Sequence, residues 1–198
     1  MPTKRLVYDF SIDLIGTKPK IWRRIQVPQN YSFWDLHVAI QDAMGWFDCH
    51  LHAFRFGKVG AAIEIGIPDD PQFSDIETLA GWETAIKEFF EIGDSCMYEY
   101  DFGDGWIHEL TLHGIKLAEK GKRYPICLDG EMACPPEDCG GIPGYYHLLG
   151  VFSDPEHEEY EDFLSWLGEA YDSKSFDPNS IKFDNPKKRF ERAFLDAP

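Results

Sequence analysis

The sequence is short of positive charge. Its 198 residues include 19 Lys and Arg against 35 Asp and Glu, which leaves a formal net charge of −16. Lys and Arg side chains that neutralise phosphates supply most of the affinity of proteins for nucleic acids, and anionic membranes attract the same side chains. We therefore expect neither a nucleic-acid partner nor a membrane partner for this chain.

The sequence also lacks long apolar runs and an even number of cysteines. Asp9, Ser11 and Asp13 interrupt any apolar stretch near the first residues, and no later segment approaches the roughly eighteen apolar residues that mark a membrane helix. The cysteines number five, and an odd number without a secretion signal fits a reducing compartment better than a disulfide framework. These absences predict a cytoplasmic protein.

Several common catalytic motifs are absent. The sequence has no phosphate-binding G-x-x-x-x-G-K-[ST] loop, no dinucleotide-binding G-x-G-x-x-G, no zinc-protease H-E-x-x-H and no G-x-S-x-G nucleophile elbow. The nucleotide-dependent and hydrolytic machineries that these motifs mark are therefore not expected.

What the sequence does contain is enough apolar material for a core. Hydrophobic residues make up 43% of the chain and aromatic residues 15%, far more than a highly charged disordered chain would carry. A chain of this length buries roughly 70% of its unfolded surface in a single core. We therefore expect one domain over residues 1–198.

Hydrophobic periodicity predicts the main elements. Apolar residues alternate over 6–14 and, after a turn at 16–20, over 21–27, which is typical of half-buried strands. Ser32 and Asp35 form a capping box for a helix over 33–44 that should end at Gly45. The remaining expected elements are a strand over 50–56, an irregular connection over 57–75, a short helix over 84–91, a hairpin of strands over 97–102 and 106–117, a loop over 120–144, and two C-terminal helices that open at Asp154-Pro155 and Asn185-Pro186.

Together these elements predict an α+β fold. The first two strands and the strand over 50–56 are expected to form a β-grasp-like mixed sheet with the helix over 33–44 packed on it. The hairpin over 97–117 should extend that sheet, and the C-terminal helices should cover it. The order of the strands does not follow from the pattern.

Arg23 falls among the apolar positions of the second strand. A guanidinium buried without a carboxylate partner is costly, so either an acid reaches it or this face opens onto a cleft. We expect Asp101, or another acid of the hairpin, to pair with Arg23.

The hairpin carries one candidate chemical site. Asp101, Asp104 and His108 could bind a divalent cation or perform general acid and base work. The plainer alternative is that Asp104-Gly105 is only a turn dipeptide and that Asp101 pairs with Arg23.

A loop rich in Gly and Pro carries Cys127, Cys134 and Cys139. Three thiolates could form three corners of a tetrahedral zinc site completed by His147 or His108, although the spacing is not the usual C-x-x-C. The alternatives are a disulfide and ordinary reduced thiols. We expect no cofactor, with zinc as the alternative.

Two further groups of residues are open to more than one interpretation. His50 and His52 lie two residues apart on an expected strand, where two imidazoles could face one metal, although satisfied or solvent-facing histidines are the plainer interpretation. The C-terminal basic cluster, Lys187, Lys188, Arg189 and Arg192, is expected to pair with the acids of residues 156–162 rather than with nucleic acid.

Several unusual motifs occur in order along the chain: IWRR with VP after it, LH followed by GW, HLHAF, YEYDFGDGW and CPPEDCGG. Over about residues 4–173 they resemble the Ri-plasmid ORF-three-like family, whose members include insertion-sequence passenger proteins of the TnpR type. The resemblance implies a compact α+β fold carried on plasmids, mobile elements and chromosomes, and it implies no particular catalytic residues. Recombinase activity is not expected, because Ser11 stands beside Asp9 and Asp13 rather than among arginines.

Two hypotheses for function follow. The first is a non-enzymatic binding or regulatory module, associated with plasmids or mobile elements, that docks an unidentified partner protein through aromatic and charged residues. The second is a metal-dependent enzyme that uses the Asp101, Asp104 and His108 group or the cysteine loop. The candidate binding residues are Trp22, Arg23, Trp46, His50, His52, Asp101, Asp104, Trp106, His108, Pro135, Glu137 and Asp138.

Overall fold

The structure is a computed structural model, and it describes residues 5–57, 63–68 and 77–195. Its strands are β1 Leu6–Leu14, β2 Ile21–Pro28, β3 His52–Phe56, β4 Ile63–Gly66, β5 Thr78–Ala80, β6 Ser95–Tyr100, β7 Trp106–Leu117 and β8 Ile126–Glu131. Its helices are α1 Phe33–Met44, α2 Gly141–Ser153, α3 Tyr160–Leu167 and α4 Pro186–Phe190, with short helical turns at Ile86–Glu88, Pro178–Ser180 and Glu191–Leu195.

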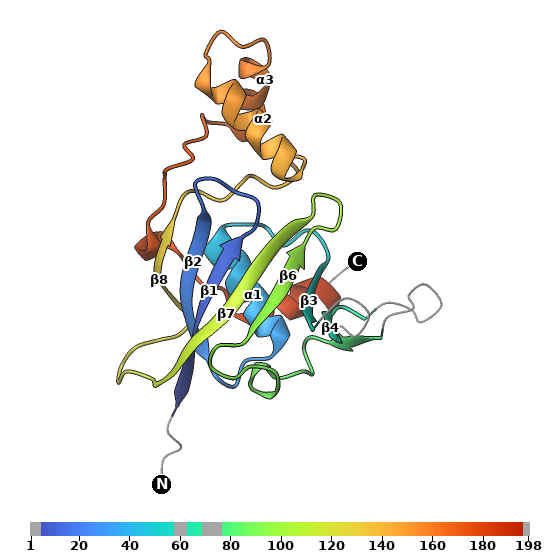
Figure 1. The fold of residues 1–198 in the computed structure, drawn as a ribbon, viewed down its shortest axis with the longest axis vertical. Coiled ribbons are helices and arrows are strands. Elements are labelled where there is room, and N and C mark those ends of the chain that lie inside the picture. Colours follow the sequence, from blue (N-terminus) through green and yellow to red (C-terminus); the bar gives the residue numbers. More distant parts are fainter. Residues whose placement is uncertain (1–4, 58–62, 69–76, 196–198) are drawn as a thin grey trace.

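The strands form one mixed sheet in the order β5-β4-β3-β6-β7-β1-β2-β8. Neighbouring strands are antiparallel except for β4 and β5, which are parallel. This confirms the expected α+β class and single domain. The β6–β7 hairpin does not lie at an edge of the sheet, because β7 pairs with β1 and β6 with β3, so the hairpin joins the two halves (Figure 1).

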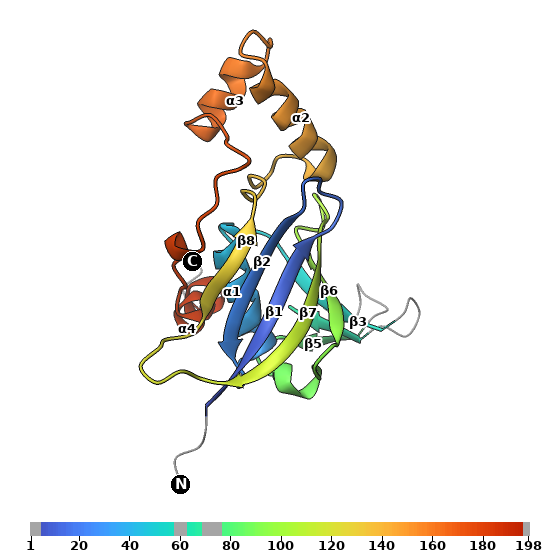
Figure 2. The same ribbon diagram turned by 60° about the vertical axis from the view of Figure 1, so that its left-hand side comes forward.

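The first strands and α1 form where the periodicity predicts them. Phe10, Ile12 and Ile25 are fully buried on the sheet face that α1 covers. The capping box is confirmed, since Ser32 Oγ accepts from the Asp35 amide at 3.1 Å and Asp35 Oδ2 accepts from the Ser32 amide at 3.0 Å. The opposite side of α1 is covered by α4, so α1 lies between the sheet and the C-terminal segment (Figure 2).

The structure differs from the predicted elements mainly in the connections. β4 forms inside the expected irregular connection over 57–75, most of the rest of which lies outside the described residues, and β5 follows that connection. β8 forms inside the expected loop over 120–144. β8 is an edge strand with a bulge opposite β2, so hydrogen bonds to β2 rather than an alternating pattern of its own define it. The expected strand over 50–56 begins only at His52, and the short helix over 84–91 is reduced to the turn Ile86–Glu88.

The helices α2 and α3 extend from one end of the sheet, beyond the β1–β2 turn (Figure 1). α2 occupies residues expected to be loop or left unassigned, and α3 begins at Tyr160 rather than at Asp154-Pro155. From α3 the chain runs back along β8 to α4 (Figure 2). Within the described ranges, every helix is too short or too polar to cross a bilayer.

Candidate functional site

A cleft of about 1120 Å³ lies where α1 ends, between the β8–α2 loop and the chain that returns from α3. Its walls are residues 43–47 and Cys49, residues 133–138, residues 166–167 and residues 174–177 with 180–181, and Arg23 lines it as well. A volume of this size is at the upper end of what small-molecule sites enclose. The cleft therefore has room for an extended peptide or a large ligand.

Arg23 is held in this cleft by backbone carbonyls. Its Nε donates to Ala43 O at 2.9 Å, and one terminal nitrogen donates to Trp22 O at 2.8 Å and Glu131 O at 3.0 Å. Its guanidinium lies 3.9 Å from the centre of the Phe176 ring. The side chain is almost completely buried, and this burial lowers the pKa of the guanidinium.

The predicted ion pair between Arg23 and the hairpin is therefore wrong. No carboxylate of the described residues lies within ion-pair distance of Arg23. The reason is geometric: the C-terminal end of α1 and the edge strand β8 direct their carbonyls to this point, and these carbonyls satisfy the donors without a counter-charge. The alternative expectation, a face that opens onto a cleft, matches the structure.

Two aromatic side chains line the cleft and remain exposed. Phe47 is 82% exposed in the loop after α1, and Trp166 is 48% exposed on α3. Neither residue was among the candidates predicted from the sequence. The position of Phe47, just after the helix stop at Gly45 and next to Asp48, was the signal that could have identified it as a loop residue.

The tryptophans that were expected to dock a partner are placed differently. Trp46 and Trp106 are buried, at 5% and 0% exposure, so the expectation that they form an exposed surface is wrong. Trp46 stacks on Tyr100 with ring centres 5.0 Å apart, and its indole donates to Pro135 O at 3.0 Å. Trp22 is half-buried on β2, and its indole donates to Glu131 at 3.5 Å. The hydrophobic effect favours burying such large rings when the core has room for them.

Glu137 connects the β8–α2 loop by hydrogen bonds to the end of β6 and to the loop after α1. Its carboxylate accepts from the Tyr100 hydroxyl and, at 3.0 Å, from the Phe47 amide. The Tyr100 hydroxyl in turn accepts from the Cys49 amide at 3.0 Å. Through these bonds the position of the exposed Phe47 is fixed relative to the loop that carries Pro135 and Glu137.

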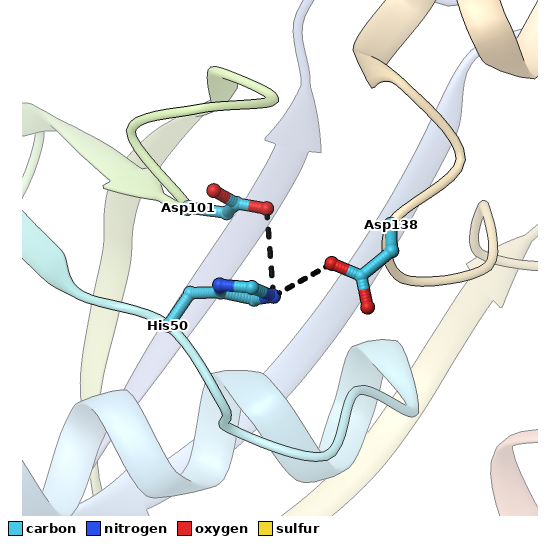
Figure 3. A group of neighbouring side chains, drawn as sticks. All are labelled: His50, Asp101 and Asp138. Carbon is cyan, nitrogen blue, oxygen red and sulfur yellow. Dashed lines mark hydrogen bonds and ion pairs between the residues drawn. The ribbon is translucent and has the colours of Figure 1, made fainter.

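Beside the cleft, three side chains from three separate loops converge (Figure 3). His50 Nε2 lies 2.9 Å from Asp138 Oδ1 and 3.7 Å from Asp101 Oδ2. His50 precedes β3, Asp101 follows β6, and Asp138 lies between β8 and α2. Both aspartates have positive φ, 53° for Asp101 and 57° for Asp138, a conformation that Asp tolerates better than most residues.

The predicted group of Asp101, Asp104 and His108 does not form. His108 lies on β7 and is fully buried, and this burial lowers its pKa to about 4. Asp104 Oδ2 instead accepts from the Gly140 amide at 3.1 Å. The chain turns out of the strand at Asp101, so the side chains at the tip of the hairpin no longer follow the alternation that was assumed.

His50 and His52 do not face one metal. His52 is buried and stacks on His37 with ring centres 3.4 Å apart, and burial, with His37 beside it, holds the pKa of His52 well below its usual value. Since the strand begins only at His52, His50 lies in a loop and points to Asp138 instead.

A buried polar network that was not predicted from the sequence lies next to this stack. His37 Nε2 lies 2.7 Å from Asp48 Oδ1, and His37 Nδ1 lies 2.8 Å from the Tyr98 hydroxyl. Gln41 also donates to the Tyr98 hydroxyl, at 2.9 Å. The signal for this network was in the sequence, because the flank of the helix over 33–44 that carries Trp34, His37, Val38 and Gln41 is less polar than a solvent-exposed flank usually is. The network connects α1 to the sheet.

The three loop cysteines are not gathered into a metal site. Among the described residues, only His50, Asp101 and Asp138 bring three possible ligand atoms within 4.8 Å of one another. Cys127, Cys134 and Cys139 are free thiols, and burial raises the pKa of Cys139 to about 12. In this arrangement the thiols are protonated at neutral pH.

The C-terminal basic cluster pairs with other acids than those expected. Arg189 lies 2.6 Å from Asp42, 3.0 Å from Asp184 and 3.6 Å from Asp48, and Arg192 lies 2.7 Å from Asp184. The expected pairing with residues 156–162 is therefore wrong, because α4 packs on α1 while α3 lies at the far end of the molecule (Figure 2).

Comparisons with known proteins agree on one set of relatives. A family model described as plasmid pRiA4b ORF-3-like protein matches residues 6–180. The uncharacterized protein y4hQ of Sinorhizobium fredii (strain NBRC 101917 / NGR234) is 35% identical over 169 residues, which cover 84% of each chain. The crystal structure of the protein of unknown function MM3350 from Methanosarcina mazei Go1 has a TM-score of 0.82 and 42% identity, and it covers 91% of this chain and 100% of its own. The family match extends over the sheet and over all residues of the cleft except Ile181.

Proposed function

This chain belongs to the plasmid pRiA4b ORF-3-like family, and from its cleft we propose that it is a non-enzymatic binding module for a segment of a partner protein. The segment carries an aromatic or aliphatic anchor flanked by Lys or Arg. Phe47 and Trp166 contact the anchor, and the acids of the cleft contact the basic flanks.

The exposed position of Phe47 is the observation that carries this proposal. Its ring is 82% exposed, while its backbone amide is hydrogen-bonded to Glu137 at 3.0 Å. The next residue, Asp48, has a φ of 63°, and its carboxylate is bound to His37 at 2.7 Å. Because hydrogen bonds already fix the backbone that carries this exposed ring, binding a partner costs little further backbone entropy, which favours affinity.

Charge supports the choice of a basic partner segment. Glu137, Asp138 and Asp177 line the cleft, against Arg23 and Lys174. The chain as a whole has a formal net charge of −16, so basic segments are drawn toward it and polyanions are repelled. The family description names a plasmid, which supports placing the partner among plasmid-encoded proteins. As part of the same proposal, this chain is an insertion-sequence passenger protein of regulatory role, and its partner is encoded by a plasmid or mobile element. The free cysteines support a cytoplasmic setting for this interaction.

Selection from a random peptide library on the immobilised full chain tests the proposal. We expect the selected peptides to combine aromatic or aliphatic residues with Lys or Arg, and to bind more weakly as salt rises. Phe47→Ala and Trp166→Ala should each weaken binding of a selected peptide about tenfold or more, as central aromatic contacts do. Ile92→Ala is the matched control, because Ile92 is 61% exposed and does not line the cleft.

Two outcomes would count against this function. One is a library that yields no peptide whose binding depends on Phe47 or Trp166. The other is a set of selected peptides that are acidic rather than basic, which would shift the interaction to the exposed Lys174 and remove the argument from charge.

A further inference from the structure

We propose that His50, Asp101 and Asp138 bind a divalent transition-metal ion, of the class of Zn²⁺ or Mn²⁺. This site goes beyond the proposed function and does not depend on it: Asp138 also lines the cleft, but His50 and Asp101 do not, and the aromatic side chains that contact the partner segment are not ligands. It also differs from the three metal arrangements considered from the sequence, since it includes neither His108, nor a cysteine, nor His52.

The distances between the ligand atoms are close to those of a metal site. His50 Nε2 lies 2.9 Å from Asp138 Oδ1 and 3.7 Å from Asp101 Oδ2. Two ligands that each lie about 2.1 Å from a tetrahedral zinc ion are separated by roughly 3.4 Å. A shift of about half an ångström in the Asp138 side chain, which is 68% exposed, would reach this separation.

Asp101 supplies a second, independent indication of a ligand. The residue is 92% buried (8% exposed). Its Oδ1 accepts from the amides of Gly103 at 2.9 Å and Asp104 at 3.3 Å, whereas its Oδ2 takes no hydrogen bond from any residue that the structure describes. Figure 3 shows this free oxygen directed at the same His50 nitrogen that Asp138 approaches. Because the Asp101 side chain is only 11% exposed, few water molecules can solvate this oxygen, and a cation would stabilise its negative charge.

The backbone around Asp101 is also held in place. The Asp101 amide donates to Leu51 O at 2.9 Å, and the Gly105 amide donates to Asp101 O at 2.6 Å. These bonds fix the hairpin end against the loop that carries His50. Two of the three ligands are therefore positioned before an ion arrives, and only Asp138 has to adjust.

The ligand set selects the class of ion. Mg²⁺ and Ca²⁺ prefer oxygen ligands alone, and soft ions prefer thiolates, whereas one imidazole with two carboxylates suits Zn²⁺, Mn²⁺ or Fe²⁺. Three protein ligands leave at least one coordination position open. The His50 side chain is 31% exposed, so water can occupy that position. A bound ion would link the loop before β3, the hairpin end and the β8–α2 loop.

The test is metal binding by the full chain, purified without a metal-affinity tag and stripped with a chelator. Titration calorimetry and native mass spectrometry with ZnCl₂ or MnCl₂ should show one ion per chain, and binding should raise the melting temperature. His50→Gln, Asp101→Asn and Asp138→Asn should each lower the affinity tenfold or more. Asp101→Asn retains an oxygen for the Gly103 amide and tolerates positive φ, so it should fold without metal.

Two controls separate this site from other metal binding. His113→Gln removes an exposed imidazole that pairs with Ser11 at 2.8 Å and should leave the affinity unchanged. Cys139→Ser should also leave it unchanged. If no ion binds at millimolar metal, or if the three site variants bind as the unaltered chain does, the proposal is wrong. Loss of binding only in Cys139→Ser would move the ion to the cysteine loop and overturn it equally.

If Asp101→Asn fails to fold, His50→Gln and Asp138→Asn still decide the question, since both side chains are partly exposed. The outcome is also separable from that of the peptide experiment. Phe47→Ala and Trp166→Ala should bind the ion normally, because neither residue offers a metal ligand.

Discussion

Arg23 offers a quantitative test of how the cleft is built. Its guanidinium joins three parts of the protein, because it donates to Ala43 O at the end of α1, to Trp22 O on β2 and to Glu131 O on β8. Arg23→Met keeps most of the apolar stem and removes all three bonds. Arg23→Lys keeps the charge, but an ammonium cannot reproduce the planar arrangement of donors.

The magnitude follows from the carbonyls that lose their donor. Each buried acceptor left unsatisfied costs about 1–3 kcal/mol, and water that enters the cleft reduces this cost toward the lower figure. Three such carbonyls predict a loss of about 3 kcal/mol for Arg23→Met and roughly half of that for Arg23→Lys. Equilibrium urea unfolding measures both losses, and hydrogen exchange of the β8 amides should show faster opening in Arg23→Met.

A double-mutant cycle with Asp101→Asn distinguishes this arrangement from an ion pair. Because Arg23 contacts carbonyls and no acid of the hairpin, the effects of Arg23→Met and Asp101→Asn should add to within about 0.5 kcal/mol. A coupling above 1 kcal/mol would restore the ion pair expected from the sequence. A loss below about 0.5 kcal/mol for Arg23→Met would refute the structural role of the guanidinium.

Two further predictions concern stability. Burial lowers the pKa of His108 from 6.5 to about 4, so the folded state binds fewer protons than the unfolded state. The free energy of unfolding should therefore be highest above pH 6.5 and should fall by roughly 3 kcal/mol as the pH is lowered toward 4. His108→Leu should remove much of this pH dependence when urea unfolding is measured between pH 6.5 and pH 4. An unchanged pH dependence in His108→Leu would contradict the prediction. The pH dependence that remains should come from His52, whose pKa is also lowered. A Cβ at Gly144 would lie 1.7 Å from Cys139 O, so Gly144→Ala should cost about 3 kcal/mol or more. Gly150→Ala, in the same helix with open space around it, should instead stabilise the protein by up to about 1 kcal/mol, and equal melting temperatures for the two variants would refute the clash.

The helices and strands whose formation depends on residues close together in the sequence could be predicted from the sequence. Ser32, Asp35 and Gly45 define the helix α1 by local capping, and the alternation of apolar residues defines β1 and β2. The same alternation, with the turn at Gly103-Asp104-Gly105, defines the hairpin. The family and the α+β class follow from such patterns. β8 could not be found in this way, because its pairing with β2 rather than its own composition makes it a strand.

The candidate site could be predicted only in its parts. His50, Asp101, Glu137 and Asp138 were all among the candidate residues, but the sequence grouped Asp101 with His108 and His50 with His52. Both groupings assumed that a strand continued where the chain in fact leaves it, at Asp101 and before His52. The partners of a loop residue depend on which other loops the sheet order brings beside it, and that order is not a local property.

The sequence by itself determined the acidic charge, the local elements and the membership of a family, since each of these depends on composition or on residues close together in the chain. Only the tertiary structure decided that Arg23 is satisfied by carbonyls, that Phe47 remains exposed and that His50, Asp101 and Asp138 meet. These arrangements join segments far apart in the sequence, and the energy of packing the whole sheet and its helices, rather than any local preference, places them together.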